Sequence, residues 1–113
     1  MAALAESAFV VTVTETEIVN RRPNGEIERV ALEDLSAILI ESNDSGPFGP
    51  DVWWLLLGSS KKKSGCVFPQ GATGEDAVLA FAQKLPGFDN RMFMEAMCSA
   101  ENQRFLCWRR PEK

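Results

Sequence analysis

The sequence predicts an α+β domain built on a curved, mostly antiparallel sheet of about six or seven strands, with two helices near the end and a final strand at the C-terminus. Segments of strand length, rich in β-branched and aromatic residues and separated by turn signals, fill the first two thirds of the chain. Apolar residues then recur at helical spacing before one last strand-like segment. Helices cannot bury their apolar faces alone, so we expect them to cap one face or one open end of the sheet.

Local patterns predict the individual strands. Residues 9–14 alternate between apolar and polar side chains and are rich in Val and Thr, which favours a half-buried strand. Pro23, Asn24 and Gly25 predict a turn, because Pro fixes φ and Asn-Gly tolerates positive φ. Residues 52–57 are apolar on both faces, which predicts a central strand covered on both sides. The predicted strands are residues 9–14, 17–22, 26–32, 37–41, 52–57, 66–68 and 104–109.

Two helices are predicted between the last two strands. The first has apolar residues at i, i+3, i+4 and i+7, with Thr73 as the expected N-cap and a Pro-Gly pair at its end. The second is expected to begin at Asp89 or Asn90. The apolar stripes are Val78, Phe81, Ala82 and Leu85 in the first helix, and Met92, Phe93, Ala96 and Met97 in the second.

Length and charge limit the class of protein. A chain of 113 residues predicts a single domain over residues 1–113, with residues 1–7 as a flexible N-terminal segment. The net charge of −4 argues against a nucleic-acid partner, because phosphate binding needs a clustered cationic face. No apolar run approaches the roughly 20 residues that span a bilayer, so we expect no membrane association. Glu6 and the lack of a basic start argue against a signal peptide.

The cysteines indicate the compartment. Cys66, Cys98 and Cys107 are odd in number, widely spaced and set in apolar surroundings, which predicts reduced, packed thiols in a cytoplasmic protein. The chain has no His, so it has no imidazole base to activate a thiolate and no Cys/His zinc site. We therefore expect no structural metal and no cofactor.

The carboxylates and glycine loops give no catalytic motif. Glu41, Asp44 and Asp51 flank one loop, but they lack the spacing of a calcium-binding loop. Residues 71–74 precede a helix start, yet Glu75 and its acidic neighbour would repel a phosphate there. The sequence thus predicts no catalytic residue.

One loop and one aromatic pair are the candidates for partner binding. Residues 42–51 form a long loop whose prolines limit its flexibility, and such loops are often functional. Phe48 is either an apolar anchor for a partner or a plug for the end of the sheet. Trp53 and Trp54 point to opposite faces of a strand, so one of them can meet a partner. The predicted partner-binding residues are Phe48, Trp53 and Asp51.

Two resemblances add to this picture. Residues 46–54 together with Leu-Pro-Gly-Phe-Asp-Asn at 85–90 are similar to a family of short uncharacterised bacterial proteins, and this resemblance implies no activity. The strand-rich start, the segment 30–40 with its break at 32–35, and the late helix resemble small bacterial pleckstrin-homology-like domains, which implies a partial barrel. Fold analogy alone does not assign a function.

The sequence therefore favours a non-catalytic binding or protein-interaction module, with a protein partner or self-association. An immunity or antitoxin-type protein is the alternative, and a small enzyme using a Cys or a carboxylate is a third reading.

Overall fold

The computed structural model describes residues 8–43, 52–59, 64–99 and 101–111. Residues 1–7, which were expected to be flexible, and residues 44–51, which hold most of the predicted loop, lie outside the described residues. The elements are β1 (Val10–Val13), β2 (Glu17–Arg21), β3 (Ile27–Ala31), β4 (Leu35–Ser42), β5 (Val52–Gly58), β6 (Gly65–Pro69), α1 (Glu75–Gln83), α2 (Asn90–Cys98) and β7 (Gln103–Arg109).

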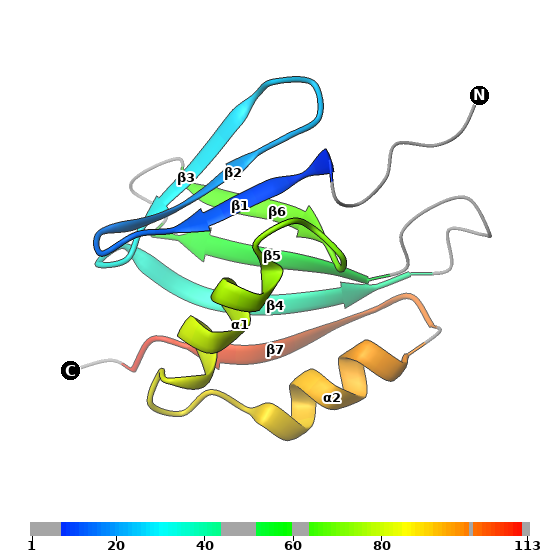
Figure 1. Cartoon of the computed structure of the whole chain (residues 1–113). Coiled ribbons are helices and arrows are strands. Elements are labelled where there is room, and N and C mark those ends of the chain that lie inside the picture. Colours follow the sequence, from blue (N-terminus) through cyan, green and yellow to red (C-terminus); the bar gives the residue numbers. More distant parts are fainter. Residues whose placement is uncertain (1–7, 44–51, 60–63, 100, 112–113) are drawn as a thin grey trace, which may run out of the picture.

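The predicted α+β class is confirmed: the described residues form seven strands and two helices, and the last of these elements is a strand, as predicted. The strands form two antiparallel sheets, ordered β1-β2-β3 and β6-β5-β4-β7, instead of one continuous curved sheet (Figure 1). The last strand, β7, pairs with β4 and becomes one edge of the larger sheet. The two sheets are not closed into a barrel, because no ladder of backbone hydrogen bonds joins β3 to β6.

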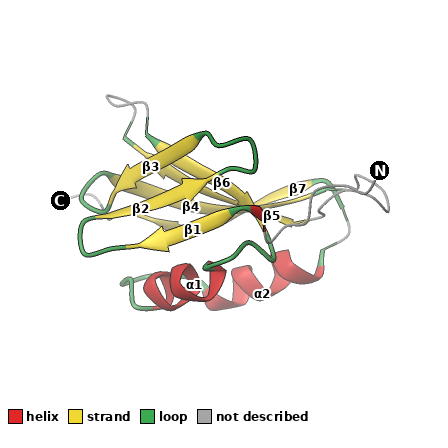
Figure 2. Cartoon of the chain, turned by 45° about the horizontal axis from the view of Figure 1, so that its top comes forward, coloured by secondary structure: helices red, strands yellow, loops and turns green. Residues whose placement is uncertain are grey.

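Both helices lie on one side of the larger sheet (Figure 2), as expected from their apolar stripes. Helix α2 contacts β7 and β4, and α1 contacts β1. The core fills the space between the helices, the smaller sheet and the facing side of the larger sheet. Its largest fully buried side chains include Trp54, Phe68, Ile18 and Leu56.

Trp54 holds this core together. Its ring stacks on Phe68 of β6 at 5.8 Å and meets Phe93 of α2 at 5.3 Å between ring centres. Its indole Nε1 donates a hydrogen bond of 2.7 Å to Glu75 at the start of α1. One side chain therefore joins β5 to its neighbouring strand and to both helices.

The start of α1 differs from the prediction. Gly74, with φ of 94°, is the N-cap and gives no side-chain cap, so the expectation of Thr73 as N-cap is wrong. The backbone of Thr73 pairs with the start of β1 instead: its N–H donates to the carbonyl of Phe9, and its carbonyl accepts from Val11 N–H. The second helix begins as expected, because Asp89 is its N-cap and accepts from Met92 N–H at 2.9 Å.

The start of the predicted loop also differs. Ser42 is not a loop residue but the buried last residue of β4. Its hydroxyl oxygen lies 2.6 Å from the carbonyl oxygen of Glu101 and 3.1 Å from the hydroxyl of Ser99. These bonds hold the end of β4 to the segment that leads into β7.

Candidate functional site

The larger sheet has one face that points away from the helices, called here the outer face. Cross-strand partners share a face of a sheet, so the strand registers arrange this face in three rows across the strand order β6-β5-β4-β7. The end row is Pro69, Trp53, Glu41 and Arg104; the middle row is Val67, Leu55, Leu39 and Leu106; the third row is Gly65, Leu57, Ala37 and Arg109.

The outer face is apolar over most of its extent. The middle row is a continuous aliphatic stripe from one edge of the sheet to the other. Leu106 and Leu57 are 46% and 40% exposed, and Leu55 and Leu39 are half-buried. Both helices lie on the opposite side (Figure 2), and on this side Trp53 and Leu55 are half-buried while Leu57 is 40% exposed. Among the described residues, the second face of residues 52–57 is therefore only partly covered, where full cover on both faces was predicted.

Trp53 lies at one end of this face, as one of the predicted partner-binding residues. It is half-buried, and its ring meets Phe9 edge-to-face at 5.8 Å. Trp54, its neighbour, is the core residue of the pair. Phe48 and Asp51, the other two predicted partner-binding residues, lie outside the described residues, as does Asp44.

A recess of about 290 Å³ opens beside Trp53. It is lined by Arg22, Glu41, Asn43, Trp53, Leu55 and Val67. Its lining combines three apolar side chains with a cation, a carboxylate and an amide. The side-chain oxygen of Asn43 is buried and accepts no hydrogen bond from the described residues. The recess therefore combines apolar and polar side chains, while this oxygen lies beneath its surface.

Among the described residues of the three rows, the charged side chains are Glu41, Arg104 and Arg109, at the margins of the outer face. Glu41 and Arg104 form an ion pair of 3.1 Å, in which the arginine side chain is 64% exposed. Such exposed pairs contribute little to stability, about 0–1 kcal/mol. Arg109 forms no ion pair with any described residue. The charges thus frame the aliphatic stripe and do not interrupt it.

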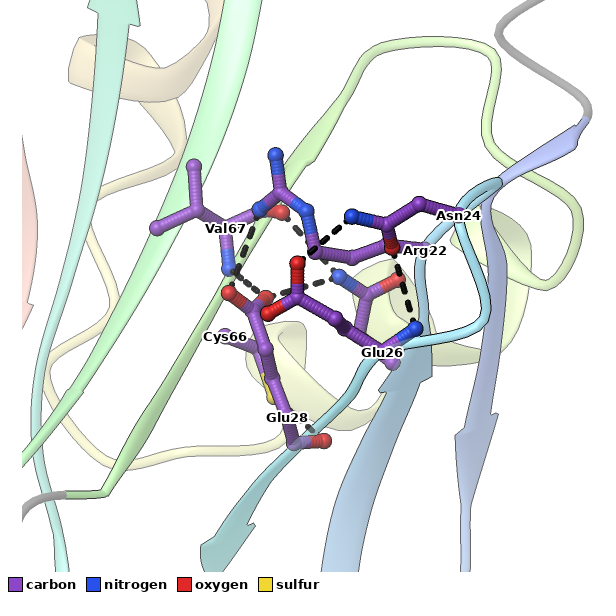
Figure 3. A network of polar contacts seen from close by, with 7 residues as sticks. Arg22, Asn24, Glu26, Glu28, Cys66 and Val67 are labelled. Carbon is purple, nitrogen blue, oxygen red and sulfur yellow. Dashed lines mark hydrogen bonds and ion pairs between the residues drawn. The ribbon is translucent and has the colours of Figure 1, made fainter.

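A polar network joins the two sheets at their adjoining edges (Figure 3). Glu28 of β3 accepts from Val67 N–H at 2.9 Å and from the Asn20 amide at 2.8 Å. The same amide donates to the Val67 carbonyl at 3.0 Å, and Arg22 pairs with Glu28 at 3.1 Å. Side chains thus take the place of a strand beside β6, which is the physical reason why the sheets do not merge.

The same network takes up the hydrogen-bonding capacity of Glu28, the most buried carboxylate of the smaller sheet. Glu28 is held by a backbone N–H, an amide and a guanidinium. These bonds tie the carboxylate of β3 to β6 and to its own sheet. The cluster therefore explains sheet packing rather than chemistry.

The thiols are free, and two of them are poorly suited to nucleophilic attack. Burial raises the pKa of Cys66 to about 12, with the nearby Glu28 charge adding to the effect. Burial raises the pKa of Cys107 to about 11, and Asp89 adds to it. Cys98 is exposed near the end of α2, so the expectation that all three cysteines are packed is wrong for this one. A reactive thiolate needs a lowered pKa, which neither buried thiol has.

The other candidate chemistries find no support among the described residues. Within residues 8–43, 52–59, 64–99 and 101–111, no group of three or more Cys, Asp or Glu could hold a metal ion. At the N-terminus of α1, Glu75 accepts hydrogen bonds from Gly71 N–H and from Trp54. A protein carboxylate therefore occupies the position that an anion would take. In the same ranges, no helix is long and apolar enough to cross a membrane.

The outer face was only partly predicted from the sequence. Leu39, Leu106 and Arg109 were not among the predicted site residues, because the sequence alone does not show which strands lie side by side in the sheet. Their shared face depends on the pairing of β4 with both β5 and β7. The available signal was the excess of apolar residues in residues 52–57 over what one buried face requires.

Comparisons with protein-family models, curated proteins and solved structures find no match to this chain. The resemblance to short bacterial proteins and to pleckstrin-homology-like domains therefore stays a prediction.

Proposed function

We propose that the chain is a non-catalytic protein-interaction module whose binding surface is the outer face of the larger sheet. The observation that supports this most is the aliphatic stripe across all four strands, which lies on the side of the larger sheet away from both helices and in which Leu106 is 46% exposed. Exposed apolar patches of a few hundred Å² on small proteins are often functional. Trp53 and the flanking arginines give this face the composition of interface centres, where aromatic residues and Arg are enriched.

The reactive side chains support a non-catalytic role. Raised pKa values of Cys66 and Cys107 disfavour their thiolates at neutral pH. Glu28, Glu41 and Glu75 are each engaged in a hydrogen bond or an ion pair. Glu28 and Glu75 join elements of the fold, and Glu41 forms an exposed ion pair. Binding is the role that we assign to the apolar outer face.

The proposed setting is a reducing cytoplasm, with a protein partner and no nucleic acid. Three free thiols suit a reducing compartment, and the net charge of −4 disfavours phosphate backbones. An immunity or antitoxin role would be one case of this function, in which the partner is a toxin.

Affinity capture tests the proposal with a matched pair of lysine variants. The purified chain, the Leu55→Lys variant and the Met94→Lys control are immobilised and exposed to extract of the cells that express the protein. Met94 is 61% exposed on α2, on the helix side of the sheet. We expect the unmodified chain and the Met94→Lys control to retain the same protein from the extract, and the Leu55→Lys variant to lose it. The reason is that a lysine in the stripe must be desolvated on binding.

Titration of the purified captured protein by calorimetry then establishes a direct contact. If the Leu55→Lys variant still captured the protein, the binding surface would lie elsewhere on the chain. Turnover of a compound by the chain would contradict the non-catalytic part of the proposal.

A further inference from the structure

We propose that the free edge of β7 takes up an extended, acidic segment of the partner protein as a further strand of the larger sheet. The inference rests on the proposed function, because it states how the partner of the outer face engages the sheet. A free strand edge carries unpaired backbone N–H and C=O groups, and an extended segment is the structure that pairs with them.

Among the described strands, β7 forms the open edge. It lies at one end of the larger sheet, whereas β1, an edge of the smaller sheet, is bridged by Thr73. The edges β3 and β6 face each other across the network of Figure 3, in which side chains bond the N–H and the carbonyl of Val67. Of the described edges, β7 is therefore the one that neither a strand nor a side-chain network covers.

The hydrogen bonds of β5 show in which direction the backbone groups of the sheet point. In an antiparallel ladder, successive residues bond alternately to the two neighbouring strands. Val52 accepts from Gln70 N–H at 2.8 Å, on the β6 side. Gly58 donates to the Ser64 carbonyl at 3.2 Å, also on the β6 side. Leu55 lies three positions from each of them, so it bonds to β4.

The same alternation leaves backbone groups of β7 unpaired. Leu39 of β4 bonds to β5, so Ile40 turns toward β7 and bonds to Phe105. Arg104 then directs its N–H and carbonyl, and Leu106 its N–H, away from the sheet. Neither residue takes part in the backbone hydrogen bonds found outside the ladders of the described residues.

The open stretch of the edge is short. A bulge follows Leu106, and beyond it the Cys107 carbonyl accepts from Asp89 N–H at 2.7 Å. Helix α2 contacts β4 as well as β7, so it lies against the inner face of the sheet (Figure 2). Residues 103–106 are therefore the length of edge with which an added strand can pair.

Two side chains define the chemistry of the added strand. On the outer face the Arg104 side chain is 64% exposed, and Leu106, two positions further on, is 46% exposed. Arg104 binds Glu41 through Nε, which leaves its terminal amino groups without a bond to any described residue. A carboxylate opposite Arg104 and an aliphatic side chain opposite Leu106 therefore fit this edge.

Charge favours the strand of another protein over a second copy of β7. The strand holds Arg104 and Arg109 and no acidic residue. Pairing of two β7 strands would gather arginines and supply a carboxylate to neither copy. An acidic extended segment supplies the missing counter-charge.

A synthetic peptide with Glu-Thr-Val-Thr repeats tests the inference on the full chain, by amide chemical shifts and hydrogen exchange. In its extended form the peptide presents Glu and Val alternately on one face. At about 1 mM peptide we expect shifts centred on Arg104 and Leu106, whose amide protons should exchange about 10-fold more slowly. A peptide with Lys in place of Glu should bind about 10-fold more weakly.

Three variants separate the backbone from the side chains. Leu106→Pro removes an N–H that the fold does not use, which edge strands tolerate, and it should abolish binding. Leu106→Ala keeps this N–H and should weaken binding by no more than about 10-fold. Arg104→Glu should reverse the preference, so that the Lys peptide binds and the Glu peptide does not. This reversal decides the test if circular dichroism shows that Leu106→Pro does not fold.

The inference is overturned if neither peptide shifts Arg104 and Leu106, if a folded Leu106→Pro variant binds as Leu106→Ala does, or if Arg104→Glu keeps the original preference. Peptide binding that is lost as the protein concentration rises would mean that a second copy takes the edge, and would overturn it too. If no peptide binds while capture still depends on Leu55, the inference fails and the proposed function stands. If the peptide binds at β7 while capture does not depend on Leu55, the edge is supported and the outer face is not the binding surface.

Discussion

Replacing Trp54 with alanine should lower the free energy of unfolding by about 4–5 kcal/mol, near the upper end for aromatic residues in a core. The side chain is fully buried, and it packs on Phe68 and Phe93. Its removal leaves a cavity and takes a hydrogen-bond donor from Glu75. The loss therefore combines a packing cost with a weakened start of α1.

Trp53→Ala is the matched control for this prediction. The two residues are neighbours in β5, so backbone propensity is the same and only the face differs. Because Trp53 is half-buried on the outer face, its replacement should cost about 1–2 kcal/mol. Urea denaturation of both variants checks the difference. If Trp53→Ala proved the more destabilising, the assignment of inner and outer faces would be wrong.

The second large effect is expected at Gly74, the N-cap of α1. A Cβ added there would lie 1.9 Å from the carbonyl oxygen of Val11, in a backbone with φ of +94°. Gly74→Ala should therefore lower the free energy of unfolding by about 3 kcal/mol or more, from backbone strain together with the collision. The collision should also separate β1 from Thr73, whose carbonyl accepts from Val11 N–H.

Gly87→Ala separates the two contributions. Gly87 has φ of +85°, and a Cβ there would meet nothing within 4 Å. Its replacement should cost only the strain of the left-handed conformation, about 1–2 kcal/mol. Thermal or urea unfolding of both variants gives the difference. Equal losses would mean that α1 and β1 do not approach each other as closely as the structure shows.

Local patterns predicted most of the elements. Alternation in residues 9–14 and the helical spacing of Met92, Phe93 and Met97 are properties of neighbouring residues, so they can be read without knowledge of the fold. The opposite orientation of Trp53 and Trp54 follows from the same geometry. Asp89 as N-cap was readable because it directly precedes an apolar stripe.

Features that depend on distant residues were not readable. The division into two sheets depends on Asn20 and Glu28, which look like ordinary polar strand residues but bind Val67, at a separation of 47 and 39 residues. Thr73 has the side chain of an N-cap, yet a parallel bridge to β1 uses its backbone.

The outer face was missed for the same reason. Leu55 alone suggests a second buried layer, and only its pairing with Leu39 and Val67 shows an exposed stripe.

The central claim is that this chain binds its partner through the outer face of the larger sheet. Backbone amide chemical shifts, recorded as the partner or further copies of the chain are added, test it most directly. We expect the changes to be centred on Leu39, Leu55 and Leu106, with α2 around Met94 unaffected. Changes centred on the helices, with the aliphatic stripe unperturbed, would contradict the account.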